Sequence, residues 1–150
     1  MDTNITKTWT ISIDEKEVFS RCTNESLYQA YVRTNDNAKG DEVVIQEDDL
    51  GQFHVYYATA LANLRMILSR RLADEGINPS LSSVFVLQMH DNHDNNILPT
   101  LIYHCYEYTI KKVLEQWYHA DFGAESERLE INHCLHYRKK PVRRRIGPMF

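Results

Sequence analysis

The sequence has few of the residues that interrupt or crosslink a chain: five glycines, four prolines and three cysteines in 150 residues. Because the glycines are scattered, they form no glycine-rich phosphate-binding loop. The cysteines are odd in number and widely spaced, which argues against a disulfide framework and fits a reducing compartment. No apolar run approaches the roughly 18 residues that span a membrane, and the first ten residues lack a signal-peptide pattern. We therefore expect no contact with a membrane.

The composition is that of an ordinary globular protein, with 43% apolar and 25% charged residues. A chain of this length can bury a sufficient core without disulfides or metal. We find no internal repeat, low-complexity tract or dividing linker. The sequence therefore predicts a single helical domain over residues 1–137, followed by a basic, extended C-terminal arm over residues 138–150.

Four segments have the three- and four-residue apolar spacing of helices. The first runs from about 14 to 34, with Phe19, Cys22, Leu27, Ala30 and Tyr31 predicted to face inward. The second begins at Asp48 or Asp49 and closes near Gly76 and Pro79, the third runs from about Asn96 to Ala120, and the fourth covers 124–138. Helices with short connections bury their apolar faces best against one another. The fold class we expect is mainly α, a four-helix bundle-like domain.

Two short runs alternate apolar and polar residues as strands do, near 8–13 and 83–89. We expect them to pair into a small ribbon. Because an isolated two-stranded ribbon is marginal unless it packs on helices or on another chain, Trp9 and Ile11 on its apolar face are candidate partner contacts.

Two histidine-rich stretches invite a metal hypothesis, since imidazole and carboxylate suit zinc or manganese. One contains His90, Asp91, His93 and Asp94, and the other contains His133, Cys134 and His136. We favour a solvated capping turn for the first stretch and a surface pair for the second, because neither has a recognisable partner cluster. With no nucleophile motif either, we expect no enzyme, no metal and no cofactor.

The charge is unevenly distributed. Six of the eight residues from 138 to 145 are basic, which leaves 11 Lys and Arg against 21 Asp and Glu in residues 1–137. The body therefore carries about −10 and the arm +6, a split typical of an arm that binds an acidic surface or a nucleic acid. The bases are Arg138, Lys139, Lys140, Arg143, Arg144 and Arg145.

The basic run is followed by apolar Ile146, Met149 and Phe150, where a solubilising tail would be polar. Burial of Met and Phe in a neighbour's groove would contribute about 2 kcal/mol or more. We therefore favour docking over disorder. The bases and these apolar residues are the predicted partner-binding residues.

The stretches "VFVLQM" and "LPTLIYHCYEYTIKKVLEQWY", followed by a short helix and "RKKPVRRRIGPMF", resemble small proteins in the structural modules of tailed phages and prophages of Bacteroides-type bacteria. The shared features fall on Leu98-Pro99, Trp117-Tyr118 and the basic run. The resemblance covers residues 83–150 well and the first half loosely.

This resemblance implies a head–tail connector (adaptor)-like subunit, which forms a ring between portal and tail proteins and uses helical bundles and extended arms. It also implies a location in the virion after assembly in the host bacterial cytoplasm. The partners would be other copies of the chain and portal or tail proteins. The alternative is a nucleic-acid-binding accessory protein that contacts phosphates through its basic arm.

Overall fold

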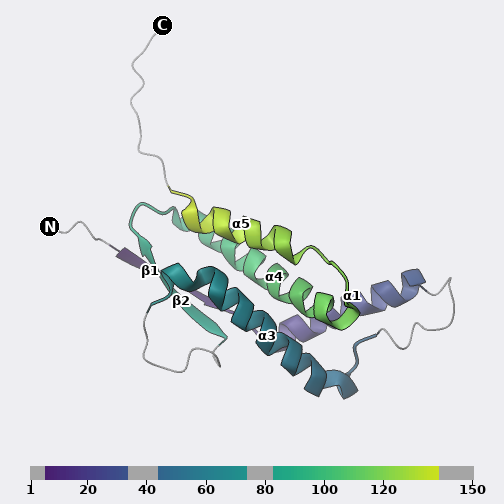
Figure 1. Cartoon of the computed structure of the whole chain (residues 1–150). Helices are drawn as coiled ribbons and strands as arrows, with labels where there is room; N and C mark the ends of the chain where they lie inside the picture. The colour runs from purple at the N-terminus through teal and green to yellow at the C-terminus, as the bar shows by residue number, and fades with distance from the viewer. Residues whose placement is uncertain (1–5, 34–43, 74–82, 139–150) are drawn as a thin grey trace, which may run out of the picture.

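The structure is a computed structural model that describes residues 6–33, 44–73 and 83–138 (Figure 1). It is mainly helical, as predicted. The helices are α1 (Glu15–Arg33), α3 (Leu50–Leu68), α4 (Leu98–Tyr118) and α5 (Ala124–His136). Two strands, β1 (Thr6–Ser12) and β2 (Val84–His90), and three short 3₁₀ turns, η2 (Glu47–Asp49), η3 (Ser69–Arg71) and η5 (Asn95–Ile97), complete the described chain.

Helix α4 is the centre of the fold. It packs against α1, α3 and α5. In Figure 1, α3, α4 and α5 lie side by side, and the C-terminal part of α1 extends past them. Pro99 occupies the first turn of α4, where its missing N–H costs nothing. Within the described residues, no helix is both long and apolar enough to cross a bilayer.

The two strands form an antiparallel pair with Trp9 opposite Leu87 and Ile11 opposite Phe85. All four side chains are at most 2% exposed, because this face of the ribbon lies against the helices. The prediction of the ribbon is confirmed. The prediction that Trp9 and Ile11 contact a partner is wrong, since the chain's own core already covers both of them.

The inward face of α1 differs from the predicted one. Val18, Cys22 and Ala30 are buried, but Leu27 is 51% and Tyr31 78% exposed. Ser26 takes the inward position instead: its hydroxyl donates to the Thr23 carbonyl at 2.8 Å and accepts from the Ile45 N–H at 2.9 Å. A buried serine is tolerated here because its polar atom is paired on both sides.

Helix α3 ends earlier than predicted. The α-helix stops at Leu68, and the chain passes through η3 to Leu72, which forms an isolated bridge with Leu87 of β2. The next N–H, that of Ala73, donates to the Val86 carbonyl at 2.9 Å. Pairing with the ribbon therefore replaces the last predicted helical turns. Gly76 and Pro79 lie outside the described residues.

Candidate functional site

Most of the predicted arm lies outside the described residues: Lys139, Lys140, Arg143, Arg144, Arg145, Ile146, Met149 and Phe150. Arg138, its first base, is described and exposed, two residues after the end of α5. The surface around the end of α5 therefore shows from where on the body the arm departs.

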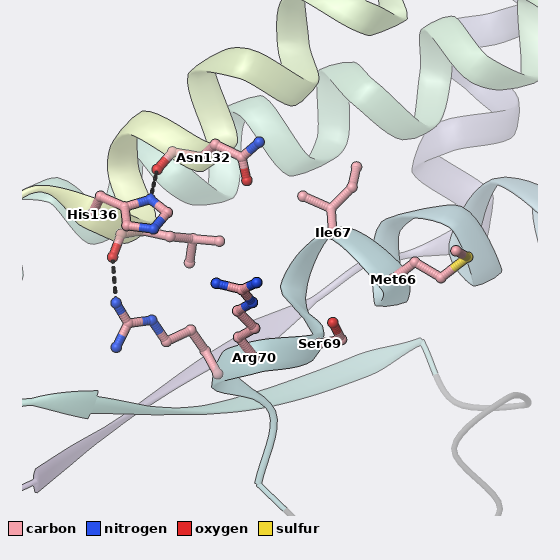
Figure 2. Close-up of a pocket in the computed structure, with 8 residues that line it drawn as sticks. Met66, Ile67, Ser69, Arg70, Asn132 and His136 are labelled. Carbon is pink, nitrogen blue, oxygen red and sulfur yellow. Dashed lines mark hydrogen bonds between the residues drawn. The ribbon is translucent and has the colours of Figure 1, made fainter.

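A recess lies beside this point, between the C-terminal ends of α3 and α5 (Figure 2). Its volume is about 490 Å³. We call it the basic recess; it is lined by Met66, Ile67, Ser69, Arg70, Arg71, Asn132, Leu135 and His136. Figure 2 shows the Arg70 guanidinium pointing into the space between η3 and α5.

The polar groups of the basic recess are partly used to close the helix ends. Arg71 donates to the Leu135 carbonyl at 3.2 Å, and His136 Nδ1 lies 2.7 Å from the Asn132 carbonyl (Figure 2). Cations beside helix C-termini are stabilised by the helix dipole. The positive charge of Arg71 therefore has a structural explanation. Arg70 is exposed and donates to no carbonyl of the described residues.

His93 stabilises the same corner from inside, with both ring nitrogens facing backbone carbonyls. Its side chain is buried, with Nδ1 3.1 Å from the His90 carbonyl and Nε2 3.1 Å from the Leu135 carbonyl. Burial lowers the pKa of His93, and its hydrogen bonds to the two carbonyls only partly oppose this shift. Asp94 caps η5 by accepting from the Asn96 N–H at 2.9 Å. The capping role expected of "HDNHD" is met by Asp94, but the stretch is not the solvated turn predicted from the sequence, because His93 is buried.

A second recess lies where α1, η2 and α3 begin, with a volume of about 520 Å³. We call it the acidic recess; it is lined by Asp14, Glu15, Lys16, Phe19, Glu47 and Leu50. Three carboxylates and one ammonium surround two apolar side chains. Leu50 is 48% exposed, and Phe19 packs edge-on against buried Phe53, with ring centroids 4.9 Å apart. The recess therefore combines an apolar floor with an acidic rim.

The two recesses lie at opposite ends of α3. Leu50, its first residue, lines the acidic recess, and Arg70, just beyond its last, lines the basic one. Twenty residues of helical rise separate them by about 30 Å. The described body therefore carries acidic side chains at the start of α3 and basic side chains at its end. Arg138, the first base of the arm, follows α5 at the basic end.

Exposed apolar side chains gather on the C-terminal part of α1. Leu27, Tyr28, Tyr31 and Val32 are between 50% and 78% exposed. Tyrosine and aliphatic side chains together are typical of protein–protein interfaces. The part of α1 predicted to be core is thus a surface suited to contact with another protein.

The buried charges form ion pairs between helices. Glu127 of α5 receives His104 Nδ1 at 2.6 Å and Lys111 Nζ at 2.5 Å, both from α4. Burial alone raises the pKa of Glu127, but these two hydrogen bonds outweigh it and hold the pKa below its ordinary value. Arg21 of α1 pairs with the largely buried Glu107 of α4 at 2.5 Å. These groups neutralise one another and serve the packing of the helices.

The three cysteines are buried and free. Burial raises the pKa of Cys22 to about 12 and that of Cys105 still further from its ordinary value. A thiol in this state is a poor nucleophile. No group of three or more His, Cys, Asp or Glu side chains within the described ranges could hold a metal ion. In the second histidine-rich stretch, the His133 ring lies near that of Tyr137 and His136 lines the basic recess.

Sequence reasoning missed both recesses. Their lining residues come from segments up to about 70 positions apart, and no local pattern joins them. The consecutive bases Arg70 and Arg71 near the end of the second predicted helix were the available signal for the basic end. Comparisons with protein-family models, with curated proteins and with solved structures gave no match to this chain.

Proposed function

We propose that this chain is a non-enzymatic assembly subunit of a tailed-phage virion, a head–tail connector or tail-completion protein. In this proposal it oligomerises in a ring and docks through its C-terminal arm on other copies and on portal or tail proteins. The virion context rests on the sequence resemblance alone. The assembly role rests on the observation that the body is acidic at one end of α3 and basic at the other, where the arm begins.

A molecule with unlike ends favours head-to-tail association. The basic arm of one copy and the acidic end of the next are complementary in charge, which steers the two into register. A head-to-tail contact differs on its two sides, and it closes into a ring when the rotation between copies permits. The exposed apolar side chains of α1, such as Tyr28 and Val32, offer a second contact area.

The non-enzymatic part of the proposal is supported by how the buried ionisable groups are used. Glu107 and Glu127 are neutralised by bases of neighbouring helices, and the buried thiols of Cys22 and Cys105 have raised pKa values. A catalytic group needs a pKa close to the working pH and access to substrate. None of these four residues meets both conditions.

Deletion of residues 138–150 tests this function. We expect a folded helical monomer, with the circular dichroism of the full chain, that no longer associates with itself or with the portal or tail proteins proposed as its partners. Sedimentation velocity and co-purification measure this loss. Association of the truncated chain at the level of the full chain would contradict the proposal.

A second candidate is a nucleic-acid-binding accessory protein. It is favoured by the arginines of the basic recess, because Arg70 and Arg71 continue the charge of the arm onto the body beside exposed Arg138. Phosphate contacts of this kind give binding that falls steeply with salt. Filter binding with duplex and single-stranded DNA at low salt tests it: affinity lost on Arg70→Gln would support this candidate, and absence of binding would remove it.

A further inference from the structure

We propose that the acidic recess of one copy receives the end of the arm, residues 143–150, of a second copy. Met149 and Phe150 would lie on Phe19 and Leu50, and the bases Arg143, Arg144 and Arg145 would lie along the acidic rim. This inference rests on the proposed function, for which it names the receiving surface and the segment that occupies it.

The apolar part of the acidic recess matches the apolar part of the arm. Leu50 is 48% exposed, and Phe19 is held from behind by the Phe53 ring. A volume of about 520 Å³ falls within the roughly 300–1,000 Å³ of sites that enclose small ligands. It therefore has room for two large side chains, which Met149 and Phe150 supply as neighbours in sequence.

The charges around the acidic recess match the rest of the arm. Glu47 lines it and exposed Asp48 follows, and within the described residues neither carboxylate has a hydrogen-bond or ion-pair partner. Glu15 is shared with His54 at 2.9 Å, and Asp14 Oδ1 accepts from the Lys16 N–H at 3.1 Å. Lys16 is the opposing charge among the lining residues, so the rim stays net negative.

Acidic residues at the start of α1 and η2 also have a local explanation, since carboxylates stabilise helix N-termini. That explanation does not extend to the exposed Leu50 or to the recess above Phe19. The pairing of an apolar floor with an acidic rim is the feature that selects a basic segment carrying large apolar side chains.

The length of the arm, and the position of its bases before its apolar residues, favour docking in a second copy over docking within the same chain. The recess lies about 30 Å from the basic end of α3, and the arm begins at that end. Within one copy, the seven steps from the Cα atom of Arg138 to that of Arg145 span at most about 24 Å even when fully extended. Of the three arginines, only Arg145 with its side chain extended as well would approach the acidic rim, and Arg143 and Arg144 would stop short of it. From a neighbouring copy, the bases and the apolar residues reach the rim and the floor together.

Two matched variants of the full chain test the proposal by sedimentation velocity. The donor variant, Met149→Ser with Phe150→Ser, removes the apolar residues of the arm. The acceptor variant, Glu47→Lys with Asp48→Lys, reverses the charge at the acidic recess. A further variant, Leu50→Ser, removes part of the apolar floor of the recess. The control, Asp91→Lys with Glu130→Lys, makes the same change in net charge at exposed positions that lie outside the recess.

The wild type and the control are expected to associate with rising concentration. The donor, acceptor and Leu50→Ser variants should each associate at least about tenfold more weakly, as several lost rim or floor contacts would produce. An equimolar mixture of donor and acceptor variants should form a one-to-one dimer that grows no further, because it contains one intact arm and one intact recess. Circular dichroism checks that each variant is folded.

Each other outcome overturns the inference in a distinguishable way. If the acceptor variant associates like the wild type while the donor variant does not, the arm docks elsewhere and the proposed function stands. If the donor variant also associates like the wild type, both the inference and the arm-based function fail. A mixture that stays monomeric would point to docking within one copy, and a wild type that stays monomeric would rule out this contact between copies.

Discussion

Arg71 donates a hydrogen bond to the carbonyl oxygen of Leu135 at 3.2 Å, and this contact joins the end of η3 to the end of α5. His93 Nε2 lies 3.1 Å from the same oxygen. Three segments distant in sequence thus meet at one carbonyl, three residues before the first base of the arm. This junction fixes the end of α5, from which the chain continues to Arg138.

Arg71→Ala should lower the free energy of unfolding by about 1 kcal/mol, because it removes a charged donor from a helix C-terminus. Arg70→Ala is the matched control, since Arg70 is exposed and makes no such contact, and surface changes of that kind usually stay within about 0.5 kcal/mol. Urea titrations of both variants measure the difference. Equal destabilisation by the two would show that the Arg71–Leu135 contact contributes nothing.

The lowered pKa of Glu127 predicts that the stability of the fold depends on pH. Burial raises the pKa of Glu127, but the hydrogen bonds from Lys111 and His104 hold it below the ordinary 4.5. The ionised carboxylate therefore stabilises the fold fully above pH 4.5, and this contribution is lost as the pH falls through the lower folded value. Glu127→Gln should lower the free energy of unfolding by about 2 kcal/mol at neutral pH. This is less than for a fully buried ion pair, because Lys111 is partly exposed. The loss should be smaller at about pH 3.5, where the wild-type carboxylate begins to lose its charge.

The control for this experiment is Glu125→Gln. Glu125 lies on the same helix and pairs with Arg128 at the surface, where solvent screens the interaction. Its stability should match that of the wild type at both pH values. A cost for Glu127→Gln that is unchanged between neutral and acidic pH would contradict the assignment of an ionised, paired Glu127.

Glu115 connects α4 to the start of α5. One carboxylate oxygen accepts from the Phe122 and Ala124 N–H groups, each at 3.0 Å. Because Glu115 satisfies the N–H of the first helical residue, Ala124, and that of Phe122 before the helix, Glu115→Ala should cost about 1–2 kcal/mol. Amide exchange should speed up in the first turn of α5 more than in α3. Glu130→Ala, at an exposed position of α5, should leave both quantities unchanged.

The elements of this fold could be predicted from the sequence because each carries its own periodic signal. The alternation of Trp9 and Ile11 with threonines and the dense apolar sequence of the third predicted helix gave the ribbon and the central helix. The inward face of α1 could not be predicted in the same way. Hydrophobic spacing favours Leu27 and Tyr31, whereas the fold buries Ser26, whose hydroxyl accepts a hydrogen bond from the distant Ile45 N–H.

The functional surfaces were predictable only in part. The charge of the arm is a property of composition and was evident from the sequence. The acidic recess was not, because Phe19 and Leu50 become neighbours only when α1 and α3 pack. Trp9 and Ile11 were assigned to a partner because a strand pattern shows that one face is buried but not what buries it.

Association kinetics should separate the two parts of the arm. The bases act through long-range attraction, so Arg143→Gln with Arg144→Gln should slow association and reduce its dependence on salt between about 50 and 500 mM. The apolar residues act at short range, so Met149→Ser with Phe150→Ser should mainly speed dissociation. Surface plasmon resonance with immobilised full-length chain measures both rates. If the arginine variant changed mainly the dissociation rate and the apolar variant mainly the association rate, the steering role of the bases would be contradicted.

The most direct test is photo-crosslinking from position 150. A photoreactive phenylalanine analogue replaces Phe150 in a chain grown in ¹⁵N medium, and this chain is mixed with unlabelled wild type. After irradiation, mass spectrometry should find the heavy arm joined to light peptides that contain Phe19 or Leu50. Crosslinks confined to the heavy chain itself, or located on the other faces of the body, would contradict docking of the arm in the acidic recess of a second copy.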